Sequence, residues 1–185
     1  IYERVLQARA DAVAKSQGLQ KDYAEQDLRV WQVRWIKYLV EARQYTRVED
    51  AINALPKDTR MSEAAAITPL QLRADAQLSK LDARIAQYRS APQLAPSSEI
   101  LRAAAHDLRG SGDNISARKI LEFAFARDLE DHQLVAGNFL GLAEIRIALG
   151  DVPGAVELLR RLTVVVGSPY ENLDSAAALL ENTGH

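Results

Sequence analysis

Apolar residues recur every three to four positions along most of this 185-residue chain, which is the spacing of an amphipathic helix. The spacing predicts a first helix over Ile1–Gln17, ended by Gly18, and a long second helix over Asp22–Tyr45. A short third helix is expected over Val48–Leu55, where Pro56 ends it. The apolar face of the long helix carries Leu28, Trp31, Trp35, Tyr38, Leu39 and Ala42.

Proline and serine divide the middle of the chain. Thr68 is expected to cap a helix whose first position is Pro69. The segment with Pro92 and Pro96 is predicted to be a connector, and Ser97 or Ser98 is expected to cap the helix that carries Ile100–Arg109. The apolar stripe before this connector continues through Leu70, Leu78, Leu81, Ile85 and Tyr88.

A short pattern of residues repeats in the second half of the chain, as "GSGDNISARKIL" from Gly110 and "ALGDVPGAVELL" from Ala148. Aligning Gly112 with Gly150 and extending the register places Thr46 and Leu78 at the turn of two earlier units. The register also gives a large apolar position at steps of 32, 34, 38 and 34 residues: Trp35, Ile67, Leu101, Phe139 and Leu173. An alanine lies sixteen residues after each of the first four: Ala51, Ala83, Ala117 and Ala155. We therefore expect a chain of repeated helix pairs.

This period and pattern resemble the tetratricopeptide repeat family, most closely in "FLGLAEIRIALGDVPGAVELLRRL". There Phe139, Leu142, Ala143, Gly150, Asp151 and Ala155 occupy family positions, and the resemblance covers Trp31 to the end of the chain. The chain departs from the family pattern at Arg146 and Leu108, where a tyrosine is expected, and at Leu159 and Leu121, where an aromatic residue is expected. The resemblance implies an all-α fold, a right-handed α-solenoid of antiparallel helix pairs.

The expected organisation is a single helical-repeat domain over residues 1–185. It begins with a helical segment at 1–30, and the repeats follow at 31–62, 63–96, 97–134, 135–168 and, in part, 169–185. Since the chain opens at Ile1 without methionine and the last unit stops at Gly184–His185, we expect the native polypeptide to continue with further repeats.

The net charge and the composition indicate which classes of partner are not expected. The formal net charge is −2, from 23 basic and 25 acidic residues, so neither nucleic acid nor an anionic membrane is an expected partner. The apolar run "LTVVVG" from Leu162 is too short to span a bilayer, and the repeat register places it at the end of a helix. The chain has no cysteine, which excludes thiol chemistry and disulfides and leaves the compartment open.

No residue pattern in the sequence indicates catalysis, a cofactor or a metal. The histidines are His106, His132 and His185, and none belongs to a paired-ligand spacing. The glycine-rich "GSGDNIS" follows a predicted helix, where a phosphate-binding turn would follow a strand, so a structural turn is favoured. We expect no enzymatic activity in this segment.

A mixture of basic and aromatic residues in the second helix raises one alternative. Single-stranded nucleic acid can bind to such a surface, here Arg29, Trp31, Arg34, Trp35 and Lys37. Both tryptophans fall on the apolar face of the helix, however, so packing in the core is favoured for them.

The family resemblance implies that the first helix of each pair lines a concave groove that receives a peptide or a partner helix. In this register the third unit places Glu99, Arg102, His106 and Arg109 in the groove, and the later units add Glu144, Asp174 and Glu181. Spacings of four and three put Arg102, His106 and Arg109 on one stripe, which can hold a carboxylate. The prediction is a groove with a basic centre and an acidic C-terminal half, although a merely solvated helix face would carry the same charges.

The leading hypothesis is a non-catalytic module for protein interaction or scaffolding. The family's carboxylate clamp needs lysine and asparagine where this chain has Ile36 and Val40, so a receptor for chaperone tails is not expected. The alternatives are an accessory helical region of a larger enzyme and an RNA-binding helical repeat. Self-association through uncapped ends of the repeat array is a further option.

Overall fold

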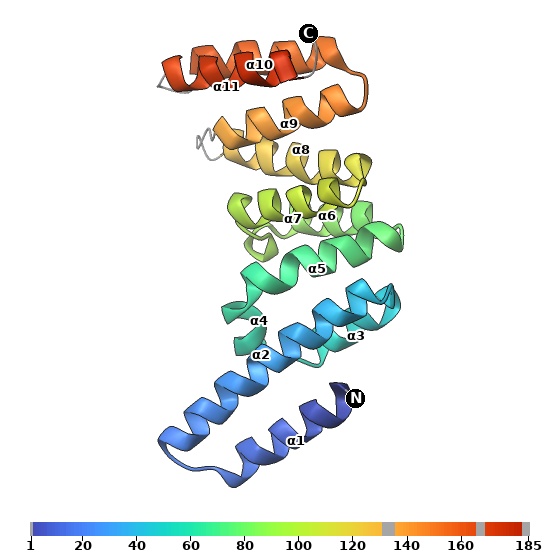
Figure 1. Cartoon of the computed structure of the whole chain (residues 1–185), viewed down its shortest axis with the longest axis vertical. Coiled ribbons are helices and arrows are strands. Elements are labelled where there is room, and N and C mark those ends of the chain that lie inside the picture. The colour runs from blue at the N-terminus through green and yellow to red at the C-terminus, as the bar shows by residue number, and fades with distance from the viewer. Residues whose placement is uncertain (1, 131–135, 166–168, 183–185) are drawn as a thin grey trace. The chain divides into compact units, whose positions relative to one another are not determined.

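The structure, a computed structural model, describes residues 2–130, 136–165 and 169–182. Every regular element in these ranges is a helix (Figure 1). The all-α prediction is therefore confirmed. The chain divides into two compact units, Ile1–Lys80 and Leu81–His185, and the division falls in the turn before α6.

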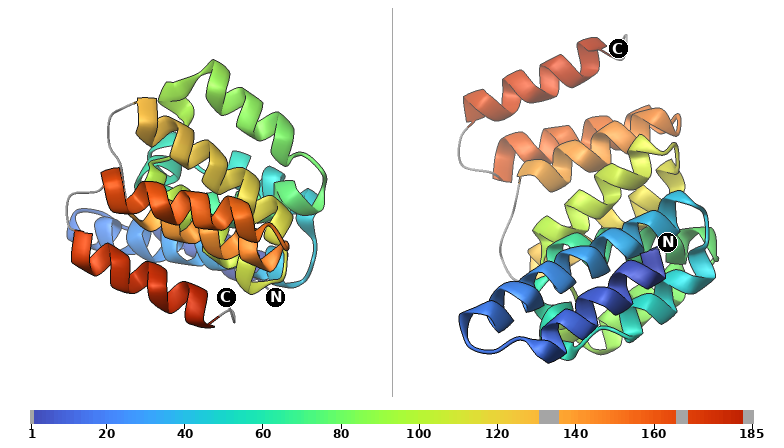
Figure 2. Two further views of the ribbon diagram at one scale, coloured as in Figure 1. Left: turned by 90° about the horizontal axis from the view of Figure 1, so that it is seen from above. Right: turned by 60° about the horizontal axis from the view of Figure 1, so that its bottom comes forward.

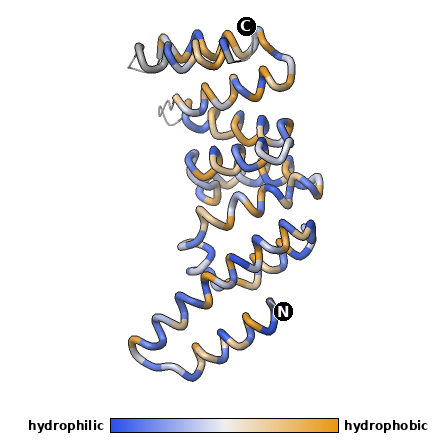
Figure 3. The backbone as a smooth tube through the Cα atoms, viewed as in Figure 1, coloured by the Kyte–Doolittle hydropathy of each residue, from blue (hydrophilic) through white to orange (hydrophobic). Residues whose placement is uncertain are grey.

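The first unit contains five helices, α1 (Tyr2–Lys15), α2 (Leu19–Glu41), α3 (Tyr45–Asn53), α4 (Lys57–Ser62) and α5 (Ala64–Gln77). The second unit contains α6 (Leu81–Ser90), the short 3-10 helix η1 (Pro92–Leu94), α7 (Ser98–Gly110), α8 (Asn114–Glu130), α9 (Ala136–Ala148), α10 (Val152–Val165) and α11 (Pro169–Asn182). Each long helix alternates apolar and polar residues along its length, as the mixed colouring of every helix in Figure 3 shows.

The core of the first unit forms where α2, α3 and α5 pack together. Its buried residues are Ile36, Leu39, Val40, Val48, Ile52, Leu55, Ile67 and Ala74. The first helix behaves differently, because α1 folds back along α2 but buries none of its own side chains (Figures 1 and 2). The hydrophobic effect therefore stabilises the second half of α2 more than it stabilises α1.

The second unit is built from helices that pack against their neighbours in sequence. Helix α7 packs against α8, α8 against α9, and α9 against α10, while α11 contacts both α9 and α10. In α7 the buried residues are Leu101, Ala104, Ala105 and Leu108, which repeat at helical spacing. The facing side of α8 buries Ala117, Ile120, Leu121 and Ala124. Alanine at several of these positions lets the two helices approach closely.

Four turns between helices share one backbone conformation. The residue with positive φ in these turns is Arg43 (57°), Ser79 (58°), Gly112 (88°) or Gly150 (82°). In each turn the following residue donates its N–H to a carbonyl five residues earlier; Gln44 bonds to Leu39, Lys80 to Asp75, Asp113 to Leu108, and Asp151 to Arg146, at 2.7–2.9 Å. This pairing is the Schellman arrangement that ends a helix. A helix–turn unit therefore recurs along the chain.

The sequence register placed the turns correctly at Gly112 and Gly150 and wrongly in the first half of the chain. Arg43 and Ser79 hold the left-handed positions, not Thr46 and Leu78. At the repeated alanine position, Ala117 and Ala155 are fully buried, whereas Ala83 is exposed. Counting from the left-handed residue restores the match, since the residues seven before it are all buried: Ile36, Leu72, Ala105 and Ala143. The residues nine after it are buried too: Ile52, Tyr88, Leu121 and Leu159.

Helix boundaries also differ from the prediction at one proline. Pro69 lies inside α5 and not at its first position, because three alanines extend the helix back to Ala64. A proline there removes one backbone hydrogen bond, at a cost that the strong helix formers before it offset. The prediction for Ser97 is confirmed, since its side chain accepts a bond from the N–H of Ile100 at 3.4 Å. Leu162 lies in α10, as the register indicated.

Candidate functional site

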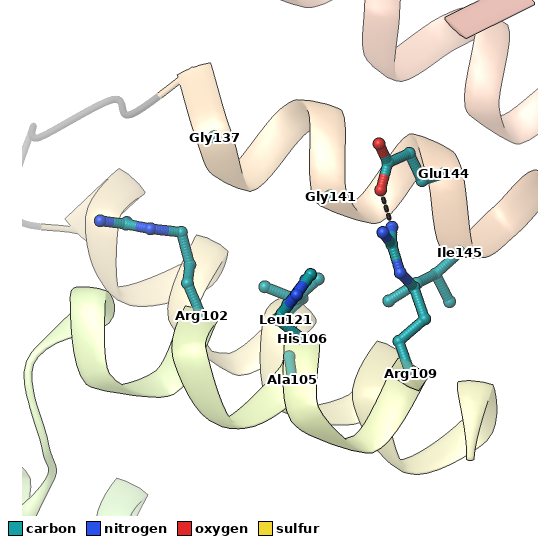
Figure 4. A pocket seen from close by; sticks show the side chains of 9 residues that line it. All are labelled: Arg102, Ala105, His106, Arg109, Leu121, Gly137, Gly141, Glu144 and Ile145. Atoms are coloured by element: carbon teal, nitrogen blue, oxygen red, sulfur yellow. Dashed lines mark ion pairs between the residues drawn. The ribbon is translucent and has the colours of Figure 1, made fainter. Parts of the chain in front are cut away.

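The three basic residues predicted for the groove line one pocket in the second unit (Figure 4). The pocket has a volume of about 180 Å³. It is lined from α7 by Arg102, Ala105, His106 and Arg109, from α8 by Leu121, and from α9 by Gly137, Gly141, Glu144 and Ile145. Cationic groups lie at its rim and buried aliphatic side chains form its floor.

The register of two helices explains this arrangement. Arg102, His106 and Arg109 are spaced by four and three residues, so they share one face of α7, while the leucines of that helix pack into the core. Gly137, Gly141 and Glu144 have the same spacing on α9 and face α7 in Figure 4. Sequence reasoning missed the two glycines, although their separation by four residues was a usable signal.

The two glycines keep the pocket open. A Cβ atom at Gly141 would lie 3.2 Å from the Cδ1 atom of Leu121, and one at Gly137 would lie 3.7 Å from the Cδ atom of Arg102. Larger side chains at these positions would extend into the space between α7 and α9. The pocket therefore depends on glycine for its room.

Arg109 forms an ion pair with Glu144 across the pocket, from α7 to α9 (Figure 4). Both side chains are about one-third exposed, at 34% and 38%. Pairs with this exposure contribute about 0.2–1 kcal/mol, because water screens them and ordering two side chains costs entropy. The basic and acidic groups predicted for separate parts of the groove are thus in contact at this point.

Arg102 is oriented by a buried polar network. Its guanidinium donates to Asn138 Oδ1 at 3.3 Å. Asn138 in turn donates from Nδ2 to Asp128, which also accepts a bond from the Ser98 hydroxyl. Asn138 is fully buried and Asp128 nearly so. Since buried polar groups need partners, this network fixes the Arg102 end of the pocket.

The remaining predicted groove residues have varied surroundings. His106 is exposed between the two arginines and makes no hydrogen bond or ion pair in the part of the chain that the structure describes. Glu99 on α7 is exposed and does not line the pocket, and the same holds for Asp174 and Glu181 on α11. The predictions for His132, Gly184 and His185 lie outside the described residues, as does the side chain of Leu173.

Trp35 packs against the core of the first unit, as the sequence predicted, and both tryptophans of α2 are partly buried beside Tyr2 of α1. The ring of Tyr2 lies 5.5 Å from the Trp35 ring and 4.8 Å from the Tyr38 ring, measured between centroids. The Arg47 guanidinium lies 5.3 Å from the Trp35 ring centroid and forms an ion pair with Glu3. These groups line a second cavity, of about 350 Å³. They are paired with one another, so the cluster helps to hold α1 on α2 and α3.

The described residues show neither a metal-binding cluster nor a membrane-spanning helix. Among them, no group of three or more acidic or histidine side chains is arranged to hold a metal ion. No helix in the described ranges combines the length and the apolar character that crossing a membrane requires.

The chain was also compared with known proteins, and no protein-family model, curated protein or solved structure matches it.

Proposed function

We propose that this chain is a non-catalytic helical-repeat module, an α-solenoid of the tetratricopeptide type, which binds a peptide or a helix of a partner protein between α7 and α9. The observation that carries the proposal is the pocket with Arg102, His106 and Arg109 at its rim. The four equivalent turns support the solenoid part of the proposal, because they repeat the same helix–turn geometry.

The size and chemistry of the pocket favour binding of a side chain. Pockets for small molecules or cofactors commonly have volumes of about 300–1,000 Å³, and this one has about 180 Å³. Arginine keeps its proton at any physiological pH, so the guanidinium groups can orient an anion but cannot exchange protons with a substrate. Two such groups above an aliphatic floor suit a peptide anchor with an acidic end.

Capture of partners from a lysate of the source organism tests the proposal. The test variant combines Arg102→Ala, His106→Ala and Arg109→Ala, and circular dichroism checks that it remains folded. The control variant, Lys57→Ala with Arg60→Ala, removes two exposed cations from α4. We expect a protein that the native chain and the control retain and that the triple variant loses.

Retention of the same proteins by all three forms would contradict the groove. Capture of no specific protein by any form would favour the alternative, an accessory helical region of a larger enzyme. These two outcomes are separable, because the first shows a partner bound elsewhere and the second shows none.

A further inference from the structure

The charged groups at the rim of the pocket do not balance. Arg102 and Arg109 contribute two positive charges, and Glu144 contributes one negative charge. His106 stands between the arginines, where its ring can donate a hydrogen bond to a ligand. A positive excess therefore remains after the ion pair of Arg109 and Glu144 has formed, which favours an anionic ligand.

The floor of the pocket indicates which kind of anion fits. Ala105, Leu121 and Ile145 are 1%, 4% and 1% exposed, so a ligand on this floor contacts aliphatic carbon. A glutamate side chain combines a short aliphatic stem with a carboxylate at its end. The open glycine face of α9 leaves room for the backbone that carries it. Shape and charge together specify an acidic side chain on a peptide.

The ion pair across the pocket places such a carboxylate in competition with the protein's own. Glu144 reaches Arg109 from the opposite wall, as Figure 4 shows. Two carboxylates in one small pocket repel each other, so a second one is accommodated best when the first withdraws. Because both partners of the pair are more than one-third exposed, Glu144 can turn into solvent at little cost.

We infer that Glu144 takes the place of the ligand's glutamate in the free protein and that a partner binds by exchanging its own carboxylate for Glu144 on Arg109. This inference rests on the proposed function of the pocket. Its consequence is that Glu144 lowers the affinity for the partner, although it lines the binding site. A groove residue with a purely structural or attractive role would have the opposite effect.

Nuclear magnetic resonance titration of the full 185-residue chain tests this exchange. The probe is a nine-residue alanine–serine peptide with one central glutamate, acetylated at its N-terminus and amidated at its C-terminus. A matched peptide carries glutamine in place of the glutamate, and a third peptide carries glutamine and a free C-terminal carboxylate. Sodium acetate serves as a carboxylate without a peptide. The amide signals of Gly137 and Gly141 report on the pocket, and those of Gly18 and Gly154 serve as references outside it.

We expect the glutamate peptide to shift the Gly137 and Gly141 signals and to bind at least about tenfold more tightly than the glutamine peptide. Glu144→Gln should bind the glutamate peptide about two- to fivefold more tightly than the native chain, since the competing ion pair is an exposed one. The gain should vanish in the background of Arg109→Ala, because there the two carboxylates no longer share a cation. Glutamine keeps the size of the side chain, so the variant changes charge alone.

Other results would overturn the inference. Equal or weaker binding of the glutamate peptide by Glu144→Gln would show that Glu144 is no competitor. Tighter binding of the peptide with the free C-terminus would replace the side chain with a main-chain carboxylate, and equal binding of acetate would reduce the site to an unspecific anion site. The proposed function fails separately, when no probe shifts Gly137 or Gly141 and the triple variant retains every captured protein.

Discussion

The α1–α2 hairpin and the α7–α8 hairpin are held together by different forces. Residues 2–35, all of which the structure describes, contain no buried side chain. That hairpin relies on stacked rings and on exposed ion pairs such as Arg9 with Asp27, and the ion pair of Glu3 with Arg47 joins α1 to α3. In contrast, α7 and α8 meet through a continuous apolar face, with Ala104, Leu108 and Ile120 all fully buried.

The two hairpins differ in the kind of interaction that their side chains make. Burial of apolar area contributes about 25 cal/mol per Å², whereas exposed ion pairs contribute little. The leucines of α7 pack into the core, whereas Arg102, His106 and Arg109 on its other face line the pocket toward α9. Several basic residues of the first hairpin, among them Arg9, Arg29 and Arg34, instead contact its own rings and carboxylates. In the second unit, the pocket between α7 and α9 presents the cations of α7 to a ligand.

The largest expected effect comes from shortening one leucine in each hairpin to alanine. Leu108→Ala deletes a fully buried side chain, and we expect it to lower the free energy of unfolding by about 3 kcal/mol, as cavity-forming substitutions do. Leu6→Ala, on partly exposed α1, should lower it by less than about 1 kcal/mol. Urea unfolding followed by circular dichroism measures both. Equal losses would mean that α1 is as firmly packed as α7.

A second test uses the tryptophans. The chain has two, Trp31 and Trp35, and both contact α1 through Tyr2. Tyr2→Ala removes these ring contacts, each of which contributes about 0.5–1.5 kcal/mol. We expect the tryptophan fluorescence transition in urea to move to lower concentration by the equivalent of about 2 kcal/mol, while the transition of the second unit stays in place. Coincident shifts of fluorescence and circular dichroism would contradict a separately opening hairpin.

The turns also differ between the two halves of the chain, because glycine holds the left-handed position only in the last two of the four turns. Gly112→Ala and Gly150→Ala should each destabilise by about 1–2 kcal/mol, through backbone strain alone, because an added Cβ atom meets no atom within 4 Å at either position. Arg43→Gly and Ser79→Gly relieve the same strain but loosen the unfolded chain, so we expect a net gain of about 0.5 kcal/mol. Thermal unfolding of the four variants measures these effects. A loss for both glycine substitutions in the first unit would show that their side chains contribute more than the turn costs.

The same turns explain how much of the fold could be predicted. Gly112 and Gly150 are visible in the sequence because glycine favours the left-handed conformation. Arg43 and Ser79 adopt it without any sequence signal, which is why the register slipped in the first unit. The prediction for Pro69 was wrong for a related reason. Proline favours the first position of a helix, but the three alanines before it extend α5 back to Ala64. Periodicity predicted the helices, and tertiary packing decided where they end.

The candidate site also has one part that the sequence predicts and one part that it does not. Helical spacing alone places Arg102, His106 and Arg109 on one face, so the sequence sufficed for that stripe. The partners of these residues come from other helices. Glu144 reaches Arg109 only because α9 packs on α7, and the link from Asp128 to Asn138 joins two helices that no local pattern connects. A single sequence carries no signal for such contacts.

The smallest test asks how much an exposed ion pair contributes, since such pairs hold α1 in place. On the solvent side of α10, the Arg160 guanidinium donates hydrogen bonds to Glu157, and these bonds, with the adjacent positive charge, lower the pKa of Glu157 below its ordinary value of 4.5. A carboxylate with a lowered pKa stabilises the folded state above its unfolded pKa, and this contribution is lost as pH falls through the folded value.

Arg160→Ala should therefore return the pKa of Glu157 toward its ordinary value, as measured by a ¹³C titration of the side chain. The difference in unfolding free energy between native and variant should be small at pH 7 and should disappear in acid below the folded pKa. A difference that persisted in acid would come from packing of the aliphatic stem of the arginine and not from its charge. The stems of the arginines that pair with carboxylates around α1 would then contribute to its stability in the same way.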